Sequence, residues 1–450
     1  MRSKIGISLK LSVILLAGVL AAGVAVAQED EKSRRDQQKT KQAQAVSKEV
    51  YDKITQAQEK VDADELPGAL RILEAMNRSD KLTEYERQNV LNYLGFVHYN
   101  MDNIKAAIST YEEMLRIPSL EEQIRKQTVY TLAQLATMEE QYTKAIRLLE
   151  EWFVLEINPA PDPFILYAQN LYQVNRYGDM IKPIETAMEV ARKREKPVKE
   201  DWYVLLNFAY FQQEDYRKVR DIQKILLVSW PKKRYWFSLA GAYTELGEEN
   251  NLFASYDAAH TQELLERESE LVTMAQLYMQ HEVPFKAASL LEAEMESGRV
   301  SRNAKNYRLL SQAWQLAQED EKSIPALKEA ARLSDEGELD LRLGNAYLNL
   351  GRYGDCISSV QAGIRKGGIK SPDNAQISLG MCLYNQQKYT ASIKAFREAR
   401  KTRRSARISN QWIKVINSDI QRNEQIALAE AAARRQIREL QKRREASGRT

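Results

Sequence analysis

The sequence has 450 residues, of which 28% are charged and 44% are hydrophobic, and its formal net charge is +4. After Ala22 no segment is apolar enough to cross a bilayer, a span that needs about 20 apolar residues. The sequence therefore excludes a multi-span membrane protein, and the body of the chain is expected to be soluble.

Residues 1–27 have the features of a secretory signal peptide. Three basic residues precede an apolar run from Leu11 to Ala22, and Ala25-Val26-Ala27 has the small-x-small form that signal peptidase recognises. We predict cleavage after Ala27 and export to the periplasm, with an uncleaved inner-membrane anchor as the alternative. An exported protein is not expected to bind nucleic acid.

Residues 28–47 are charged and nearly lack large apolar side chains, so this segment is predicted to be a tether or a frayed helix. The next segment, residues 48–76, keeps an apolar spacing through Ala57, Leu66, Ala69 and Leu73. It departs elsewhere from the pattern that follows, as terminal repeats usually do. We interpret it as the N-terminal cap of a repeat array that extends over residues 48–402.

The pattern of one supersecondary unit occurs twice in succession between Gly337 and Ala399. Leu343-Gly344 is followed by Tyr347 and Tyr353, and Leu379-Gly380 is followed by Leu383 and Tyr389. Each unit predicts two short amphipathic helices joined by a tight turn, with a large side chain three residues after a small one. A second helix can approach closely at the small position.

The small residue recurs along the chain and serves as the marker of each unit. Successive markers are 33 to 39 residues apart, and the marker residues are Ala57, Gly95, Ala133, Ala168, Asn207, Ala240, Ala275, Ser311, Gly344 and Gly380. This pattern resembles the tetratricopeptide repeat, whose period is about 34 residues. The resemblance implies an all-α, right-handed helical solenoid of about ten helix-turn-helix repeats, and an ordinary helical bundle is the alternative. Pro183, Pro284 and Pro325 are expected in the first turns of second helices.

The character of the chain changes after the last repeat. Trp412, Ile416 and Ile420 form a stripe, which predicts a capping helix over residues 403–425 that covers the final repeat. Residues 426–450 are predicted to be a basic, Ala/Arg-rich helical tail. From Arg397 onward there are fifteen basic and six acidic residues. Such a tail can contact an anionic membrane surface, an acidic protein or the solenoid itself, or can simply be solvated.

The two cysteines, Cys356 and Cys382, lie in neighbouring repeats at positions that favour small buried side chains. We favour two buried thiols, with a disulfide as the alternative for a protein in an oxidising compartment. The three histidines are isolated, and the sequence has no metal-ligand cluster, phosphate-binding loop or nucleophile motif. We predict no metal, no cofactor and no enzymatic activity.

The repeat register nominates a partner-binding surface. In the tetratricopeptide fold the first helix of each unit lines a concave face, with side chains one, four and five residues after the marker and three and six before it. The nominated residues are Asn92, Phe96, Tyr99, Asn100, Tyr130, Gln134, Tyr172, Gln173, Phe208, Phe211, Gln212 and Phe237, continued by Arg308, Gln312, Asn345, Tyr384 and Asn385. Aromatic rings and amides suit an extended peptide, although any of these rings can instead pack between units. Lys and Arg are sparse among them.

The overall layout resembles the periplasmic tetratricopeptide proteins that accompany TonB–ExbB–ExbD energy-transduction systems in Gram-negative bacteria. The similarity rests on the signal peptide, the degenerate repeats and the terminal segment around Gln411-Trp412-Ile413. It implies a soluble accessory that contacts the transducer or an outer-membrane receptor during nutrient uptake. The alternatives are a scaffold for cell-wall or outer-membrane assembly and an enzyme within a helical shell. The sequence leaves the oligomeric state open.

Overall fold

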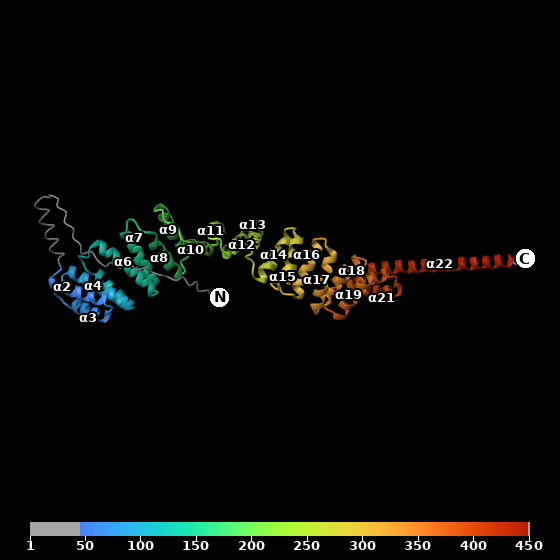
Figure 1. Ribbon diagram of the computed structural model, residues 1–450, viewed down its shortest axis with the longest axis horizontal. Coiled ribbons are helices and arrows are strands. Elements are labelled where there is room, and N and C mark those ends of the chain that lie inside the picture. The colour runs from blue at the N-terminus through green and yellow to red at the C-terminus, as the bar shows by residue number, and fades with distance from the viewer. Residues whose placement is uncertain (1–45, 449–450) are drawn as a thin grey trace. The chain divides into compact units, whose positions relative to one another are not determined.

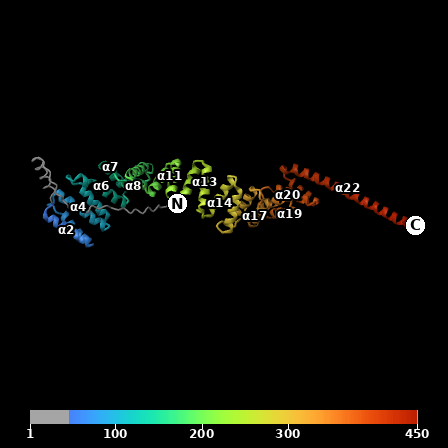
Figure 2. The same ribbon diagram turned by 45° about the horizontal axis from the view of Figure 1, so that its top comes forward.

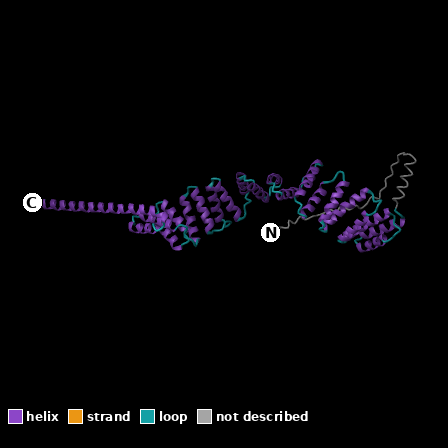
Figure 3. Cartoon of the chain, turned by 180° about the vertical axis from the view of Figure 1, so that it is seen from behind, coloured by secondary structure: helices purple, strands orange, loops and turns teal. Residues whose placement is uncertain are grey.

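A computed structural model describes residues 46–448, and over that range the chain forms helices joined by short loops, without a strand (Figure 3). The predicted signal peptide, and the predicted tether up to residue 45, lie outside the described residues. None of the described helices is both long and apolar enough to span a membrane. The chain divides between Leu246 and Gly247 into two compact units.

The first unit consists of five helix hairpins followed by a single helix (Figure 1). Each helix packs against its neighbours along the chain, so successive hairpins stack. The helices are α2 (Lys48–Asp62), α3 (Leu66–Asn77), α4 (Glu84–Asn100), α5 (Ile104–Leu115), α6 (Glu122–Met138), α7 (Tyr142–Leu155), α8 (Pro161–Gln173), a 3-10 turn η1 (Gly178–Met180), α9 (Ile181–Lys193), α10 (Glu200–Gln212), α11 (Tyr216–Ser229) and α12 (Lys233–Glu245).

The second unit begins with a single helix and continues through four hairpins to a long final helix (Figure 2). Its helices are α13 (Glu249–Thr261), α14 (Glu268–Gln280), α15 (Pro284–Glu296), α16 (Ala304–Leu316), α17 (Asp320–Leu333), α18 (Glu338–Asn349), α19 (Tyr353–Lys366), α20 (Pro372–Asn385), α21 (Tyr389–Ala399) and α22 (Arg403–Ser447). The two units confirm the predicted all-α, tetratricopeptide-like array of stacked hairpins. The remaining predicted repeat corresponds to α12 and α13, which belong to different units.

The turn inside each hairpin has the same backbone conformation. In all nine hairpins of the described chain one turn residue has a φ between 57° and 72°, namely Asp64, Asp102, Glu140, Asn175, Glu214, Glu282, Gln318, Gly351 and Gln387. A left-handed residue after a helix redirects the chain so that the next helix runs back along the first. Tyrosine is the first residue of α7, α11, α19 and α21, close after this turn.

The marker residue lies at the point of closest approach between the two helices of a hairpin. An added Cβ at Gly95 would lie 2.6 Å from the Tyr111 ring, and one at Gly380 would lie 2.7 Å from the Phe396 ring. A Cβ at Gly344 would collide with Val360. In each case the opposing side chain follows the glycine by sixteen residues, so the same contact recurs in three hairpins. Seven of the ten markers are residues with a larger side chain, and six of these are also buried; Asn207 alone is half-buried.

In two repeats, the tyrosine three residues after the marker links its helix to the preceding helix. The Tyr210 hydroxyl of α10 donates a hydrogen bond to Glu185 of α9 at 2.7 Å, and the Tyr278 hydroxyl of α14 donates to Asp257 of α13 at 2.6 Å. Burial and the adjacent carboxylate raise the pKa of both tyrosines above their ordinary value. The repeat therefore uses this position for a polar link as well as for apolar packing.

The final hairpin is covered as the sequence predicts. The Trp412 ring of α22 lies parallel to the Phe396 ring of α21, with centroids 5.6 Å apart, and Ile416 is fully buried. Arg404 and Ser405 of α22 hold the Asp373 carboxylate at the start of α20, and the Arg404 hydrogen bond holds the pKa of Asp373 well below its ordinary value. The capping segment and the basic tail are one continuous helix with no break at residue 425.

Two sequence predictions need correction. The structure joins Cys356 of α19 and Cys382 of α20 in a disulfide, with their Cα atoms 6.1 Å apart, whereas two free thiols were the favoured interpretation. The two packed positions face each other across a hairpin interface, which periodicity alone did not establish. Pro325 lies in the interior of α17 instead of its first turn, because that helix begins at Asp320.

A charged cluster joins the start of α10 to the start of α12 within the first unit. The Glu200 carboxylate lies 2.6 Å from both Lys232 Nζ and an Arg234 guanidinium nitrogen, and it accepts a hydrogen bond from the Tyr235 hydroxyl. The Lys232 and Tyr235 hydrogen bonds are the main causes that lower the pKa of Glu200 from 4.5 to about 2.

Replacing Gly344 with leucine is expected to lower the free energy of unfolding by about 1–3 kcal/mol, because the new side chain would overpack the contact with Val360. Urea denaturation followed by circular dichroism measures the change. Gly241→Ala is the control, since its added Cβ meets no atom within 4 Å and Gly in a helix costs about 0.5–1 kcal/mol relative to Ala. Equal stability of the leucine variant and the wild type would contradict the assigned register.

The low pKa of Glu200 predicts an acid-dependent loss of stability. Below its unfolded pKa the unfolded state binds more protons than the folded state, so the contribution of the cluster is present above pH 4.5 and is lost as the pH falls toward 2. Unfolding of the wild type and of Glu200→Gln, measured from neutral pH downward, should differ most at neutral pH and converge in acid. Asp201→Asn, on the same helix and without an ion pair to any described residue, should show no such convergence.

Candidate partner-binding groove

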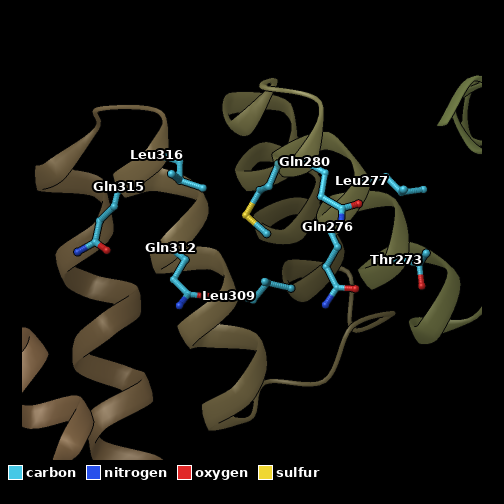
Figure 4. A pocket seen from close by; sticks show the side chains of 9 residues that line it. Thr273, Gln276, Leu277, Gln280, Leu309, Gln312, Gln315 and Leu316 are labelled. Carbon is cyan, nitrogen blue, oxygen red and sulfur yellow. The ribbon is translucent and has the colours of Figure 1, made fainter. Parts of the chain in front are cut away.

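A groove of about 830 Å³ lies on the first helices of two neighbouring hairpins in the second unit (Figure 4). Its walls come from α14 and α16, and its lining residues are Thr273, Gln276, Leu277, Met279, Gln280, Leu309, Gln312, Gln315 and Leu316. A smaller hollow of about 220 Å³ adjoins it between α16 and α18, lined by Arg308, Ser311, Gln312, Gln315, Leu327, Arg342, Asn345, Ala346 and Asn349. Gln312 and Gln315 line both, so the two hollows form one surface, here called the amide groove.

Six side-chain amides define the polar character of the amide groove. They come from all three helices and are Gln276, Gln280, Gln312, Gln315, Asn345 and Asn349. None of these side-chain amides makes a hydrogen bond to another described residue. Figure 4 shows Gln276 and Gln312 extending from neighbouring helices on the groove side. Each amide offers both donors and an acceptor, so the row matches a ligand that presents N–H and C=O groups in alternation.

The amide groove also contains an apolar strip and two cations. Leu277, Met279, Leu309 and Leu316 supply the apolar surface, and Leu316 is 60% exposed. Arg308 and Arg342 are exposed on the α16–α18 side and form no ion pair within the described chain. No carboxylate belongs to the lining. The lining therefore carries a positive charge, which comes from these two arginines alone.

The repeat register explains why these residues share a surface. The positions one, four and five residues after the markers Ala275, Ser311 and Gly344 supply both glutamines of α14, both glutamines of α16 and both asparagines of α18. Among the nominated residues, Arg308, Gln312 and Asn345 lie in the groove. Gln276, Gln280, Gln315 and Asn349 occupy the same register positions and were not among the predicted residues. Arg342 lies two residues before its marker and was missed by the register.

The nominated residues of the first unit include an aromatic cluster between two hairpins. The ring centroids of Tyr172 and Phe208 are 5.0 Å apart, and that of Tyr177 is 5.2 Å from Phe208. Phe208 therefore packs between hairpins. Phe211 is 50% exposed, and its ring centroid lies 5.9 Å from that of Tyr216. Gln173 and Gln212 are exposed beside this cluster.

Other nominated residues of the first unit serve packing. Gln134 is buried, and the Tyr130 ring lies 4.9 Å from Trp152, where burial raises the pKa of Tyr130 to about 12. Tyr99 packs against the N-terminal core. Phe237 is half-buried beneath the Lys233 ammonium.

The polar members at the N-terminal end are partly accessible. Asn92 and Phe96 are half-buried, and the exposed Asn100 amide donates to the Phe96 carbonyl at 3.0 Å. In the second unit Tyr384 donates a hydrogen bond to Asp419 of α22 at 2.7 Å and contacts Trp412, so it belongs to the cap, and the Asn385 amide donates to the Met381 carbonyl.

The histidines do not form a metal site in the described part of the chain. Over residues 46–448 no three His, Cys, Asp or Glu side chains come together in a way that could hold an ion. His281 instead stacks on Phe253 with ring centroids 4.3 Å apart.

The sequence matches no protein-family model and no curated protein. Among solved structures it is similar to a tetratricopeptide repeat protein from Parabacteroides merdae ATCC 43184, at 14% identity and a TM-score of 0.35, covering 64% of this chain and 94% of that one. It is also similar to the TPR2AB domain of yeast Sti1 in its pHSP90 complex, at 15% identity and a TM-score of 0.33 over 58% of this chain and 98% of that one. MamA from Desulfovibrio magneticus RS-1 is similar at 14% identity and a TM-score of 0.33, over 41% of this chain and 96% of that one. These similarities concern the fold alone.

Phe208→Ala is expected to destabilise the first unit by about 1–3 kcal/mol, because it removes a ring packed against Tyr172 and Tyr177 and leaves a cavity. Phe211→Ala removes the same side chain from a half-exposed position on the same helix and should change stability by less than about 0.5 kcal/mol. Thermal or urea unfolding compares the two. Equal losses would show that Phe211 is as much a core residue as Phe208.

Proposed function

We propose that the chain is a non-catalytic docking scaffold that holds an extended segment of a partner protein in the amide groove. The observation that carries the proposal is the row of six amides on three successive first helices, none of them hydrogen-bonded to another described residue. An extended backbone presents donors and acceptors along its length, and amide side chains can pair with both. The apolar strip would receive alternate side chains of that segment.

The dimensions of the amide groove set the length of the segment. Packed helices lie about 8–10 Å apart, so three successive first helices span roughly 20 Å. An extended chain rises about 3.3 Å per residue, and the groove thus accommodates about six residues. Arg308 and Arg342 favour an acidic side chain at the end that lies over α16 and α18, because guanidinium groups bind carboxylates through paired hydrogen bonds.

We further propose that the scaffold works in the periplasm as an accessory of a TonB-type energy-transduction complex. The predicted signal peptide supports export, and the buried Cys356–Cys382 disulfide suits an oxidising compartment. The layout of degenerate repeats followed by a Trp412-bearing terminal helix supports the more particular assignment to a TonB, ExbB or ExbD partner. A scaffold for cell-wall or outer-membrane assembly is the competing assignment, and identifying the partner by crosslinking separates the two.

Photo-crosslinking from the amide groove tests the partner. A photoreactive residue at Gln312 should capture a TonB, ExbB or ExbD protein from cell envelopes, whereas one at Lys328, exposed on the second helix α17, should not. Capture of cell-wall or outer-membrane assembly factors at Gln312 would support the competing assignment. Identical products at both positions would contradict docking in the groove.

Substitution of the groove amides tests its energetics. Gln276→Ala combined with Gln312→Ala should weaken binding of the captured partner by about 1–3 kcal/mol, since each neutral hydrogen bond contributes about 0.5–1.5 kcal/mol. Calorimetric titration measures the affinity, and the melting temperature should stay unchanged because neither amide holds the fold together. Gln318→Ala, at an exposed turn position, is the control. An unchanged affinity in the double variant would rule out the groove as the binding surface.

A further inference from the structure

The first part of α22 packs on the last hairpin through a stripe of residues whose intervals along the helix alternate between four and three positions. Six residues, each four or three positions after the previous one, face that hairpin: Ser405, Ser409, Trp412, Ile416, Asp419 and Asn423. Ser405 hydrogen-bonds Asp373, Trp412 lies against Phe396, and Asp419 accepts from Tyr384. Ser409 and Ile416 are fully buried. A 4-3 alternation repeats every seven residues and is the spacing with which one helix packs along another.

The same stripe continues beyond the last hairpin, where no other described helix covers it. Its next members are Ile426, Glu430, Ala433, Ile437, Leu440 and Arg444, still at alternating intervals of three and four. Every residue from Gln421 to Arg444 is exposed, and Ile426, Ile437 and Leu440 are 51%, 55% and 59% exposed. Figures 1 and 2 both show this part of α22 projecting past α21. A stripe that is covered in its first half is therefore bare in its second half.

We propose that the exposed half of α22 binds an amphipathic helix of a partner protein, one with apolar residues in the heptad pattern and acidic residues beside them. The partner helix would pack on the stripe where α21 ends and would continue the interface that Trp412 and Ile416 already form. Ala433 allows the backbones to approach closely, while Ile426, Ile437 and Leu440 provide the knobs.

The charge of the exposed half selects an acidic partner over a second copy of the chain. Between Gln421 and Arg444 there are seven basic residues and three acidic ones. Arg434 and Arg443 flank the stripe directly, at positions where charges choose the partner of a coiled coil. Two copies would bring two such basic segments together, whereas glutamates on a partner helix would pair with them.

The composition of the exposed half also favours a helix over a lipid surface. Membrane binding by a surface helix grows with the apolar area that it buries, and most of the apolar residues here are alanines. Alanine adds little apolar area, yet it brings two helices close together. Leu428 is 65% exposed and lies away from the stripe, so it makes a matched control for Leu440.

A synthetic helix tests this surface on the full chain. The probe is a fluorescent peptide of about four heptads with leucine at the core positions and glutamate at the flanking ones. Anisotropy should show binding, and Leu440→Ser should weaken it about tenfold, as the loss of one buried leucine predicts. Leu428→Ser should bind like the wild type, and both variants should keep the same helical circular dichroism signal. Equal binding by the two serine variants would overturn the assignment of the stripe.

Three further measurements separate the other occupants of this surface. The same peptide with lysine in place of glutamate should bind at least about tenfold more weakly, and equal binding would overturn the charge argument. Sedimentation should show that the wild-type chain does not self-associate through the stripe. Self-association that Leu440→Ser abolishes would identify a second copy as the occupant. Any binding to vesicles containing phosphatidylglycerol should be the same for the wild type and Leu440→Ser. Binding that Leu440→Ser weakens would identify a lipid surface as the occupant instead.

Discussion

The close contact between the two helices of a hairpin is the constraint on which the rest of the structure depends. Gly95, Gly344 and Gly380 each leave room for a side chain sixteen residues later, so the helices meet at one fixed point along their lengths. That point sets the rotation of the first helix about its axis. Once the marker faces the second helix, the residues one, four and five positions later lie together on an adjacent face of the first helix, and most of them line the amide groove.

The polar side chains of the amide groove and those of Tyr210 and Tyr278 differ in whether the protein itself satisfies their hydrogen bonds. Tyr210 and Tyr278 are buried, and each hydroxyl is satisfied by a carboxylate of the preceding helix, so these tyrosines hold neighbouring helices in register. Gln312 and Asn345 are half-buried with amides that no described residue satisfies. A polar group that is half-buried and has no protein partner is available to a ligand. The functional proposal therefore rests on the amide groove and not on Tyr210 and Tyr278.

The sequence predicted much of the fold, because small and large residues recur at fixed spacing and each hairpin is a local structure. The markers, the turns and the cap around Trp412 all follow from that spacing. What the sequence could not settle depends on contacts between hairpins. Tyr130 and Gln134 satisfy the groove register, yet Gln134 is buried and Tyr130 is half-buried against Trp152, since the side chains of the adjacent helix decide whether a position is open. Cys356 and Cys382 are separated by 26 positions, and only the packing of α19 on α20 brings them together.

The disulfide between α19 and α20 alters how the C-terminal end of the second unit can come apart. In stacked repeats each hairpin is held mainly by its immediate neighbours, so an array opens from its ends one hairpin at a time. A covalent bridge across one interface fuses the two hairpins beside it into a single cooperative block. The terminal hairpin of α20 and α21, with α22 resting on it, then cannot peel away from α18 and α19 while the bridge is oxidised. Reduction would restore that step and make the anchoring of the long helix sensitive to the redox state of its surroundings.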